Sequence, residues 1–155
     1  MQIRKATIDD AKAIIALIKE LAEYENLSEA VDIDENVFIS HIFKRELAHV
    51  LVAVSDEKVV GYALFFYSFS TFLGRSGIYL EDLYVKKEFR GRGIGLNFIK
   101  ELAKICENEG LGRLEWECLD WNEPSIKFYE NLGAKRQNGW IKFRMTKDEI
   151  KELIK

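Results

Sequence analysis

Hydrophobic residues recur with helical spacing in two long segments of the chain. In residues 11–25 the apolar side chains fall three and four positions apart, and Asp9 or Asp10 precedes them as an N-cap. A second stripe runs through residues 93–109 and ends at Gly110, a residue type that commonly terminates helices. We therefore predict helices over these two ranges. Weaker or shorter patterns predict further helices at residues 34–45, 122–131 and 146–155.

Runs of β-branched and aromatic residues predict strands between these helices. Residues 47–54, 58–68 and 77–85 are separated by short turn-forming segments, so we expect an antiparallel meander. Shorter strands are predicted at residues 3–6, 114–119 and 140–145. In the second half of the chain strands alternate with helices, which is typical of parallel crossovers. The expected fold is one α/β domain over residues 1–155, with a mixed sheet that is antiparallel first and partly parallel later.

The composition excludes several classes of function. With 155 residues and a net charge of −3, the chain lacks the basic surface that general nucleic-acid binding requires. It has neither a signal peptide nor an apolar stretch of membrane-spanning length, so we expect a cytoplasmic protein that does not engage a membrane. Its cysteines and histidines show no metal-ligand spacing, and no metal site is expected.

The segment Arg90-Gly91-Arg92-Gly93-Ile94-Gly95 lies at a predicted strand-to-helix junction. Glycines there let backbone N–H groups approach a ligand, and a helix N-terminus attracts negative charge. Together with Lys86 and Lys87 the two arginines form a basic cluster, which favours a phosphate-bearing ligand. The spacing matches neither a P-loop nor a dinucleotide fingerprint. A flexible surface loop with solvated arginines is the alternative.

A second constellation occupies the predicted helix at residues 122–131. Asn122 is a good N-cap, and Pro124 is tolerated in the first turn. Asn122, Ser125 and Tyr129 are spaced so that they share one helix face. The alternative is a capping asparagine with a buried tyrosine anchored by its hydroxyl.

Taken together, the two segments resemble the GNAT family of N-acetyltransferases. The family's acetyl-CoA motif, (Q/R)-x-x-G-x-(G/A), matches Arg90, Gly93 and Gly95. Its following pattern, N-x-x-(S/A)-x-x-x-Y-x-x-x-G, starts at Asn122 and ends at Gly133. The resemblance is closer to the spermidine/spermine and thialysine acetyltransferase branch. It rests there on residues 17–25, 79–85 and 121–125, and it is weakest between Val31 and Val50.

The resemblance implies that the chain binds acetyl-CoA. In this family the strand before the glycine loop bonds the pantetheine arm through its backbone, the loop backbone cradles the pyrophosphate, and the later helix lines the other side of the arm. The residues so implied are Leu83, Tyr84, Val85, Arg90, Gly91, Arg92, Gly93, Ile94, Gly95, Leu96, Asn122, Glu123, Pro124 and Ser125.

The resemblance also implies two catalytic residues. Tyr129 corresponds to the family's general acid, and a phenol with a pKa of about 10 can protonate a departing thiolate whose thiol has a pKa of about 8.5. Glu81 is the best candidate for a base that deprotonates the amine through water. The alternative for Glu81 is a carboxylate that is ion-paired with a neighbour.

An acidic group of residues matches positions that line the amine site of the polyamine-acetylating relatives. These residues are Tyr24, Glu25, Glu81, Glu115, Trp116 and Glu117. Glu115 and Glu117 are expected on one face of their strand and Trp116 on the other. Several carboxylates around one cleft would attract a polycation, so the expected acceptor is a polyamine or diamine. A simple solvated face is the alternative for the glutamate pair.

One departure from the polyamine enzymes leaves the acceptor open. Those enzymes carry an Asp and a Trp in the hairpin before the Leu-Glu-Asp segment, whereas this chain has Ser70-Thr71-Phe72. That hairpin is closer to the thialysine branch, so thialysine or another lysine-like amino acid is the alternative substrate. A catalytically silent acyl-CoA-binding module is a third possibility. The resemblance further implies a homodimer, with the predicted strand at residues 140–145 as an exchange element.

Overall fold

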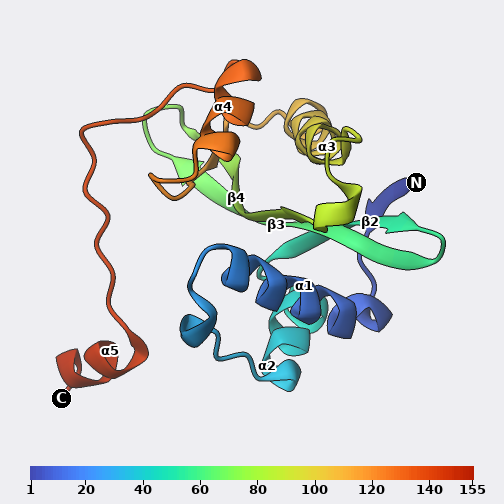
Figure 1. Cartoon of the computed structure of the whole chain (residues 1–155). Helices are drawn as coiled ribbons and strands as arrows, with labels where there is room; N and C mark the ends of the chain where they lie inside the picture. The colour runs from blue at the N-terminus through green and yellow to red at the C-terminus, as the bar shows by residue number, and fades with distance from the viewer. The chain divides into compact units, whose positions relative to one another are not determined.

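The computed structural model describes residues 1–155 and consists of two compact units, residues 1–117 and residues 118–155. The first unit contains a five-stranded sheet with the order β1-β2-β3-β4-β5 (Figure 1). The pairs β1–β2, β2–β3 and β3–β4 are antiparallel, and β5 runs parallel to β4. The expected mixed sheet is therefore confirmed. The strands are β1 (Gln2–Lys5), β2 (His49–Ser55), β3 (Lys58–Ser70), β4 (Arg75–Val85) and β5 (Leu114–Trp116).

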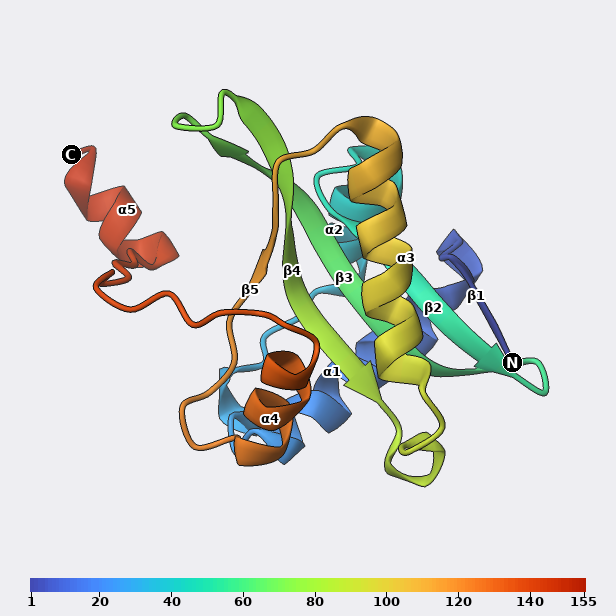
Figure 2. The same ribbon diagram turned by 90° about the horizontal axis from the view of Figure 1, so that it is seen from above.

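Helices cover both faces of this sheet. Helices α1 (Ala11–Tyr24) and α2 (Glu35–Ile39) lie on one face, and α3 (Ile94–Glu109) lies on the other (Figures 1 and 2). The predicted helix at residues 34–45 is formed by α2 together with a π-helical turn, Ser40–Lys44. Short 3-10 turns occupy Ile8–Asp10, Ser28–Ala30 and Lys87–Phe89. The second unit contains α4 (Glu123–Asn131) and α5 (Lys147–Leu153).

Each face of the sheet has its own hydrophobic core. The cluster under α3 includes Ile78, Leu80 and Phe98, and the cluster under α1 includes Leu17 and Tyr62. Both helices supply their apolar stripe to the sheet, which is why the helical periodicity in the sequence identified them correctly. Membership of one cluster or the other shows to which side of the sheet a buried strand residue points.

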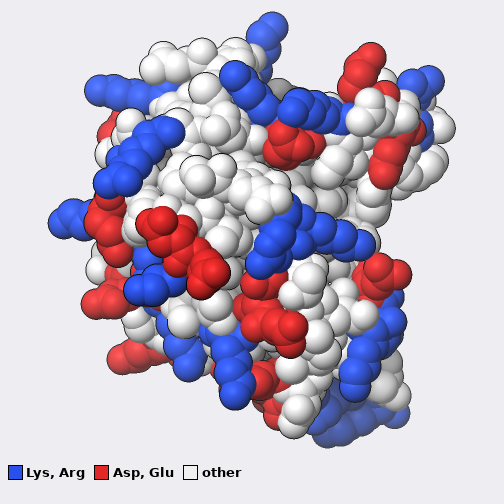
Figure 3. Space-filling view, turned by 90° about the vertical axis from the view of Figure 1, so that its right-hand side faces the viewer, with Lys and Arg blue, Asp and Glu red and all other residues white.

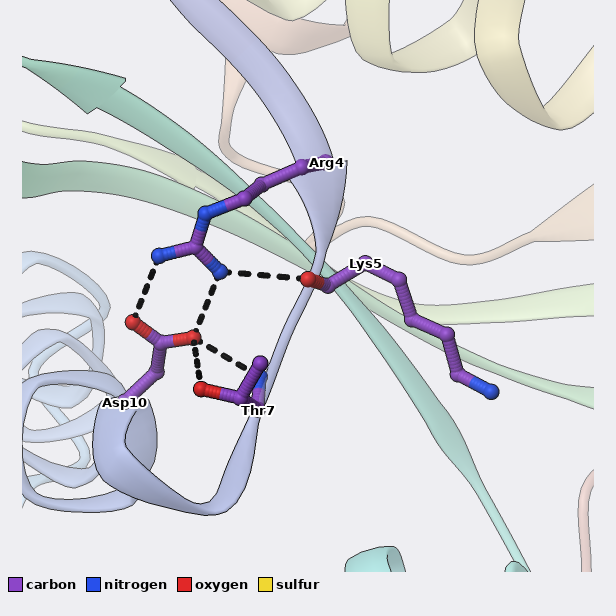
Figure 4. A network of polar contacts seen from close by, with 4 residues as sticks. All are labelled: Arg4, Lys5, Thr7 and Asp10. Carbon is purple, nitrogen blue, oxygen red and sulfur yellow. Dashed lines mark hydrogen bonds and ion pairs between the residues drawn. The ribbon is translucent and has the colours of Figure 1, made fainter.

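A polar network joins β1 to the start of α1 (Figure 4). The guanidinium of Arg4 donates two hydrogen bonds to the carboxylate of Asp10, at 2.7 and 3.0 Å. The backbone N–H of Thr7 donates to the same carboxylate at 2.8 Å. The hydrogen bond from Arg4 holds the pKa of Asp10 below its usual value, and the bond from Thr7 adds to this effect. The network thus holds the beginning of α1 against the edge strand of the sheet.

Two expectations about strands are wrong. Residues 140–145 form no strand, and the predicted strand at residues 114–119 ends at Trp116. A β-strand needs a neighbour to pair its backbone N–H and C=O groups, and residues 140–145 have no such neighbour in their own chain. Their side chains are exposed, with Trp140 82%, Ile141 80% and Phe143 89% accessible to solvent.

Charged side chains of both signs are mixed on the surface that Figure 3 draws, and neither sign covers it continuously.

No helix of the protein is both long enough and apolar enough to cross a membrane.

Candidate active site

The glycine loop leads directly into α3. Gly91 and Gly93 have positive φ values of 73° and 77°, a conformation that L side chains rarely adopt. A Cβ atom at either position would meet no atom within 4 Å, so the loop backbone borders open space that a side chain would fill. Gly93 is the N-cap of α3, no side chain caps this end, and the first turn carries no acidic residue. The loop therefore suits an anionic group such as a phosphate.

The second half of β4 lacks a strand partner on one side. The parallel ladder pairs Ile78 with Leu114 and Leu80 with Trp116, and β5 ends there. Strand β4 continues to Val85 with only β3 as its neighbour in the sheet. This is the stretch that contains Leu83, Tyr84 and Val85, for which the resemblance to the GNAT family implies backbone contacts with the pantetheine arm.

A β-bulge at Glu81 changes the direction of the side chains that follow it. Leu64 pairs with Asp82, whereas the next residue of β3 pairs with Leu80, so Glu81 is an extra residue in β4. Leu80 packs under α3, and strict alternation would place Glu81 on the α1 side and Asp82 under α3. Because of the bulge, Asp82 instead bonds to Tyr62 in the cluster under α1. Two consecutive carboxyl groups are thereby directed to the α1 side of the sheet.

Asp82 and Glu25 form an acidic pair on that side. The hydroxyl of Tyr62 donates to Asp82 at 2.9 Å. Desolvation raises the pKa of Asp82 and the charge of Glu81 raises it further, while the bond from Tyr62 opposes the shift. Desolvation and the charge of Asp82 likewise raise the pKa of Glu25. Neither carboxylate has an ion pair with a Lys or Arg side chain. The pair therefore suits a cationic ligand.

Arg90 is held by contacts within the protein. Its Nε donates to the carbonyl oxygen of Val85 at 2.8 Å. Its guanidinium lies over two aromatic rings, 5.1 Å from the ring centre of Tyr24 and 5.4 Å from that of Tyr84. Arg92 makes contacts only within the loop segment, where it bonds the carbonyl of Glu88 at 3.1 Å and lies 5.2 Å from the ring centre of Phe89.

The structure separates the residues that the sequence assigned to β5 and its end. Trp116 packs against the cluster under α3, so it points away from the side of the sheet that holds Glu25 and Asp82. Glu115 forms an ion pair with Arg113 at 3.2 Å. Glu117 accepts a hydrogen bond from Tyr79, and both glutamates raise the pKa of that tyrosine after the larger effect of its desolvation.

In the second unit, α4 has the local structure that the sequence predicted. The side chain of Asn122 accepts a hydrogen bond from the N–H of Ser125 at 3.4 Å and so caps the helix. Glu123 opens the helix and Pro124 lies in its first turn. Tyr129 lies seven residues after the cap, within the helix. Across the whole chain, no group of three or more His, Cys, Asp or Glu side chains is arranged to hold a metal ion.

Sequence reasoning missed Asp82 and Tyr62. Alternation along the strand places Asp82 opposite Glu81, and Tyr62 reads as one aromatic residue in an apolar run. The one available signal was the pair of adjacent acidic residues in an otherwise hydrophobic strand, which regular pleating cannot accommodate on two buried faces.

Comparisons with known proteins identify the family of the chain. The model of the acetyltransferase (GNAT) family matches residues 12–134. The chain is 39% identical to thialysine N-epsilon-acetyltransferase of Bos taurus, covering 99% of this chain and 96% of that protein. It is 31% identical to spermidine/spermine N(1)-acetyltransferase-like protein 1 of Homo sapiens, over 98% of this chain and 23% of the much longer human protein.

A solved structure gives the same answer for the fold. An integron cassette protein from the mobile metagenome of V. cholerae superposes with a TM-score of 0.82 at 26% identity, covering 99% of this chain and 97% of that one. Since the family model and the full-length relatives agree, the chain belongs to the GNAT family and is an N-acetyltransferase with the GNAT fold.

Proposed function

We propose that the protein transfers an acetyl group from acetyl-CoA to the terminal primary amine of a small cationic acceptor. We also propose that both units act together as one acetyltransferase domain. The observation that carries this proposal is the bulge at Glu81, which directs Glu81 and Asp82 to the side of the sheet where Glu25 lies. An acidic pair without a cationic partner is suited to an ammonium group of the acceptor.

The glycine loop and the open side of β4 are the proposed acetyl-CoA site. When bound, acetyl-CoA supplies an acyl group activated as a thioester. The N–H groups of the loop and of the first turn of α3 hold the pyrophosphate, because this end of α3 has no cap of its own. The backbone of Leu83, Tyr84 and Val85, which has β3 as its only strand neighbour, holds the pantetheine arm. In the second unit, the resemblance to the family assigns Asn122, Pro124 and Ser125 at the start of α4 to acetyl-CoA binding.

Two side chains move protons in the proposed mechanism. Glu81 accepts the proton of the acceptor ammonium through a water molecule, since an amine must be neutral to attack a carbonyl carbon. Tyr129 donates its phenolic proton to the leaving sulfur, which raises the rate by about 10²–10⁴-fold in typical cases of general acid catalysis. Asp82 and Glu25 keep the acceptor in place by binding its positive charge.

Thialysine or a similar lysine-like amino acid is the first acceptor to test, and polyamines are the second. Four curated relatives named as thialysine N-epsilon-acetyltransferases, at 33–39% identity, support this order. The similarity to a protein named for spermidine and spermine supports the second class. The hairpin residues Ser70, Thr71 and Phe72 also lack the carboxylate that the polyamine enzymes have at this place.

Thiol release from acetyl-CoA tests the proposal directly. The purified protein is assayed with thialysine, lysine, putrescine, spermidine, spermine and an aminoglycoside, and the product is identified by mass spectrometry. We expect turnover with thialysine to exceed turnover with the others. Acetyl-CoA binding without release for any amine would contradict the enzymatic proposal and support the silent acyl-CoA-binding module.

We further propose that two copies of the chain associate through residues 140–145. The exposed aromatic and aliphatic side chains of this segment support the idea, because isolated segments rarely leave so many large apolar groups in water. Sedimentation should show a species of twice the chain mass of 18.0 kDa, and replacing Trp140 and Phe143 by Ser should favour the monomer. A wild-type protein that sediments only as a monomer would contradict the dimer.

A further inference from the structure

A chain of side-chain contacts connects the glycine loop to the C-terminal end of α1. Arg90 lies just before the loop glycines, and its guanidinium lies over the rings of Tyr24, the last residue of α1, and Tyr84 of β4. The next residue after Tyr24 is Glu25, one of the two carboxylates of the acidic pair. The loop and the acidic pair are thus linked by a single arginine.

Further contacts make this connection stiff. The hydroxyl of Tyr84 donates to Glu20 of α1 at 3.1 Å, and Lys86 forms an ion pair with Glu20 at 3.2 Å. On the other side, the bond from Arg90 to the carbonyl of Val85 ties the guanidinium to the end of β4. The last turns of α1, the end of β4 and the start of the loop are therefore held together at one place.

The geometry of Arg90 differs from that of a simple phosphate ligand. A guanidinium that binds phosphate presents its N–H groups in the plane of the fork to the anion. Here Nε, one of those N–H groups, donates to the carbonyl oxygen of Val85, and the guanidinium carbon lies over the rings of Tyr24 and Tyr84. Arg92, two residues later, has no contact with α1 and provides a natural comparison.

We propose that Arg90 is a positioning residue that couples acetyl-CoA binding at the glycine loop to acceptor binding at Glu25 and Asp82. An ordered loop fixes Arg90, Arg90 fixes Tyr24, and Tyr24 fixes the end of α1 from which Glu25 projects. Occupation of one site then strengthens binding at the other, and by thermodynamic linkage the effect is equal in both directions. This inference rests on the proposed function for the acetyl-CoA site at the glycine loop and for the acceptor site at Glu25 and Asp82.

The first experiment measures the coupling. The dissociation constant of thialysine is determined by calorimetry with and without saturating CoA, which is not consumed. In the wild type we expect CoA to tighten acceptor binding by about fivefold or more. Arg90→Lys keeps the charge but loses the guanidinium and its Nε hydrogen bond, and Tyr24→Leu loses the ring, so both should bring this ratio close to one. Tyr24→Phe keeps the ring and should retain the ratio, as should the matched control Arg92→Lys.

The second experiment needs no acceptor. Hydrogen exchange is followed at the amides of Glu25, Asn26 and Leu27, which close the end of α1 through bonds to Leu21, Glu23 and Ala22. Acetyl-CoA should slow their exchange in the wild type, in Tyr24→Phe and in Arg92→Lys, and should leave it unchanged in Arg90→Lys and Tyr24→Leu.

The two experiments separate the failure of this inference from the failure of the proposed function. If acetyl-CoA protects the end of α1 as expected but no amine of the panel binds, the acceptor assignment fails and the connection through Arg90 stands. A wild-type ratio of one together with unchanged exchange overturns the connection. A third result also overturns the connection. In it, Arg90→Lys weakens the binding of acetyl-CoA, while Tyr24→Leu preserves both the ratio of thialysine dissociation constants and the slower hydrogen exchange. Arg90 then acts as a phosphate ligand.

Discussion

The hydroxyl of Tyr62 donates a hydrogen bond of 2.9 Å to Asp82, and this bond joins a fully buried residue of β3 to a carboxylate of β4 on the α1 side of the sheet. Desolvation and the nearby Asp82 charge raise the pKa of Tyr62, so the phenol keeps its proton and donates to Asp82 near neutral pH. The bond in turn lowers the pKa of Asp82 against the effect of desolvation. A buried tyrosine thereby helps to keep the carboxylate of Asp82 ionised.

Replacing Tyr62 by Phe should move the acid limb of the acceptor kcat/KM to higher pH. Asp82 binds a cation only when it is ionised, and loss of the donor raises its pKa beyond the present upward shift, so protonation interferes earlier as the pH falls. The loss of one buried hydrogen bond should cost about 0.5–1.5 kcal/mol of stability. A pH profile of kcat/KM measures the effect.

Tyr67→Phe is the matched control for this variant. The hydroxyl of Tyr67 bonds to Glu109 at the end of α3, and desolvation with this bond raises the pKa of Tyr67 to about 12. Removing the hydroxyl of Tyr67 should leave the pH profile of kcat/KM the same as that of the wild type. Superimposable profiles for the wild type and Tyr62→Phe would show that Tyr62 does not act on Asp82.

Replacing Asp82 by Asn should raise the KM of the acceptor by about 10- to 100-fold, because a hydrogen bond to a charged group contributes about 1.5–3 kcal/mol. The KM of acetyl-CoA should change little, since the glycine loop is not altered. Steady-state kinetics with each substrate varied in turn distinguishes the two effects. Asp56→Asn, in the exposed turn between β2 and β3, is a control for loss of negative charge. Equal effects of the two variants would refute a local role of Asp82.

Replacing Gly93 by Ala should weaken acetyl-CoA binding by about tenfold, equivalent to 1.4 kcal/mol. The positive φ of 77° becomes strained, and the new Cβ enters the open space that the loop backbone borders. Gly110→Ala is the control, because Gly110 has a φ of 66° with similar open space at the other end of α3. Both variants should lose about 1–2 kcal/mol of stability. If calorimetry shows that the affinity for acetyl-CoA falls equally in Gly93→Ala and Gly110→Ala, acetyl-CoA does not bind at the glycine loop.

Replacing Tyr129 by Phe should lower kcat by about 10²–10⁴-fold while the affinity for acetyl-CoA stays close to that of the wild type. The substitution removes only the acidic proton and preserves the ring beside Phe128. Single-turnover thiol release together with equilibrium binding tests both parts. An unchanged kcat would remove Tyr129 from the mechanism.

Replacing Asp10 by Asn should destabilise the fold by about 1–3 kcal/mol near neutral pH, because the carboxylate then no longer satisfies Arg4 and Thr7. The pKa of Asp10 is lowered in the folded state, so its contribution is complete above the unfolded value of about 3.9 and disappears as the pH falls through the folded value. Urea unfolding between pH 7 and pH 3 should show the two proteins converging at the acid end. A constant difference would mean that charge is not the cause.

The helices and most strands follow from local patterns. The predicted helix at residues 11–25 is α1 to within one residue, and the predicted helix at residues 93–109 is α3 to within one residue. Their apolar stripes face the sheet, and burial of such stripes is what periodicity reports. The predicted strand at residues 140–145 was wrong because a local pattern does not show whether a pairing partner exists. Its pattern favours a strand, but no partner in the chain pairs with it.

The sequence by itself determined which residues form the glycine loop, the capped helix at Asn122 and the acidic segment of β4, since each depends on neighbours in the chain. Only the tertiary structure decided that Asp82 faces Tyr62 and that Arg90 lies over Tyr24. The first depends on the register between β3 and β4, where one extra residue reverses every later side chain. The second depends on α1 and the loop meeting at the end of β4. Contacts between segments so far apart in the chain leave no periodic signal in either.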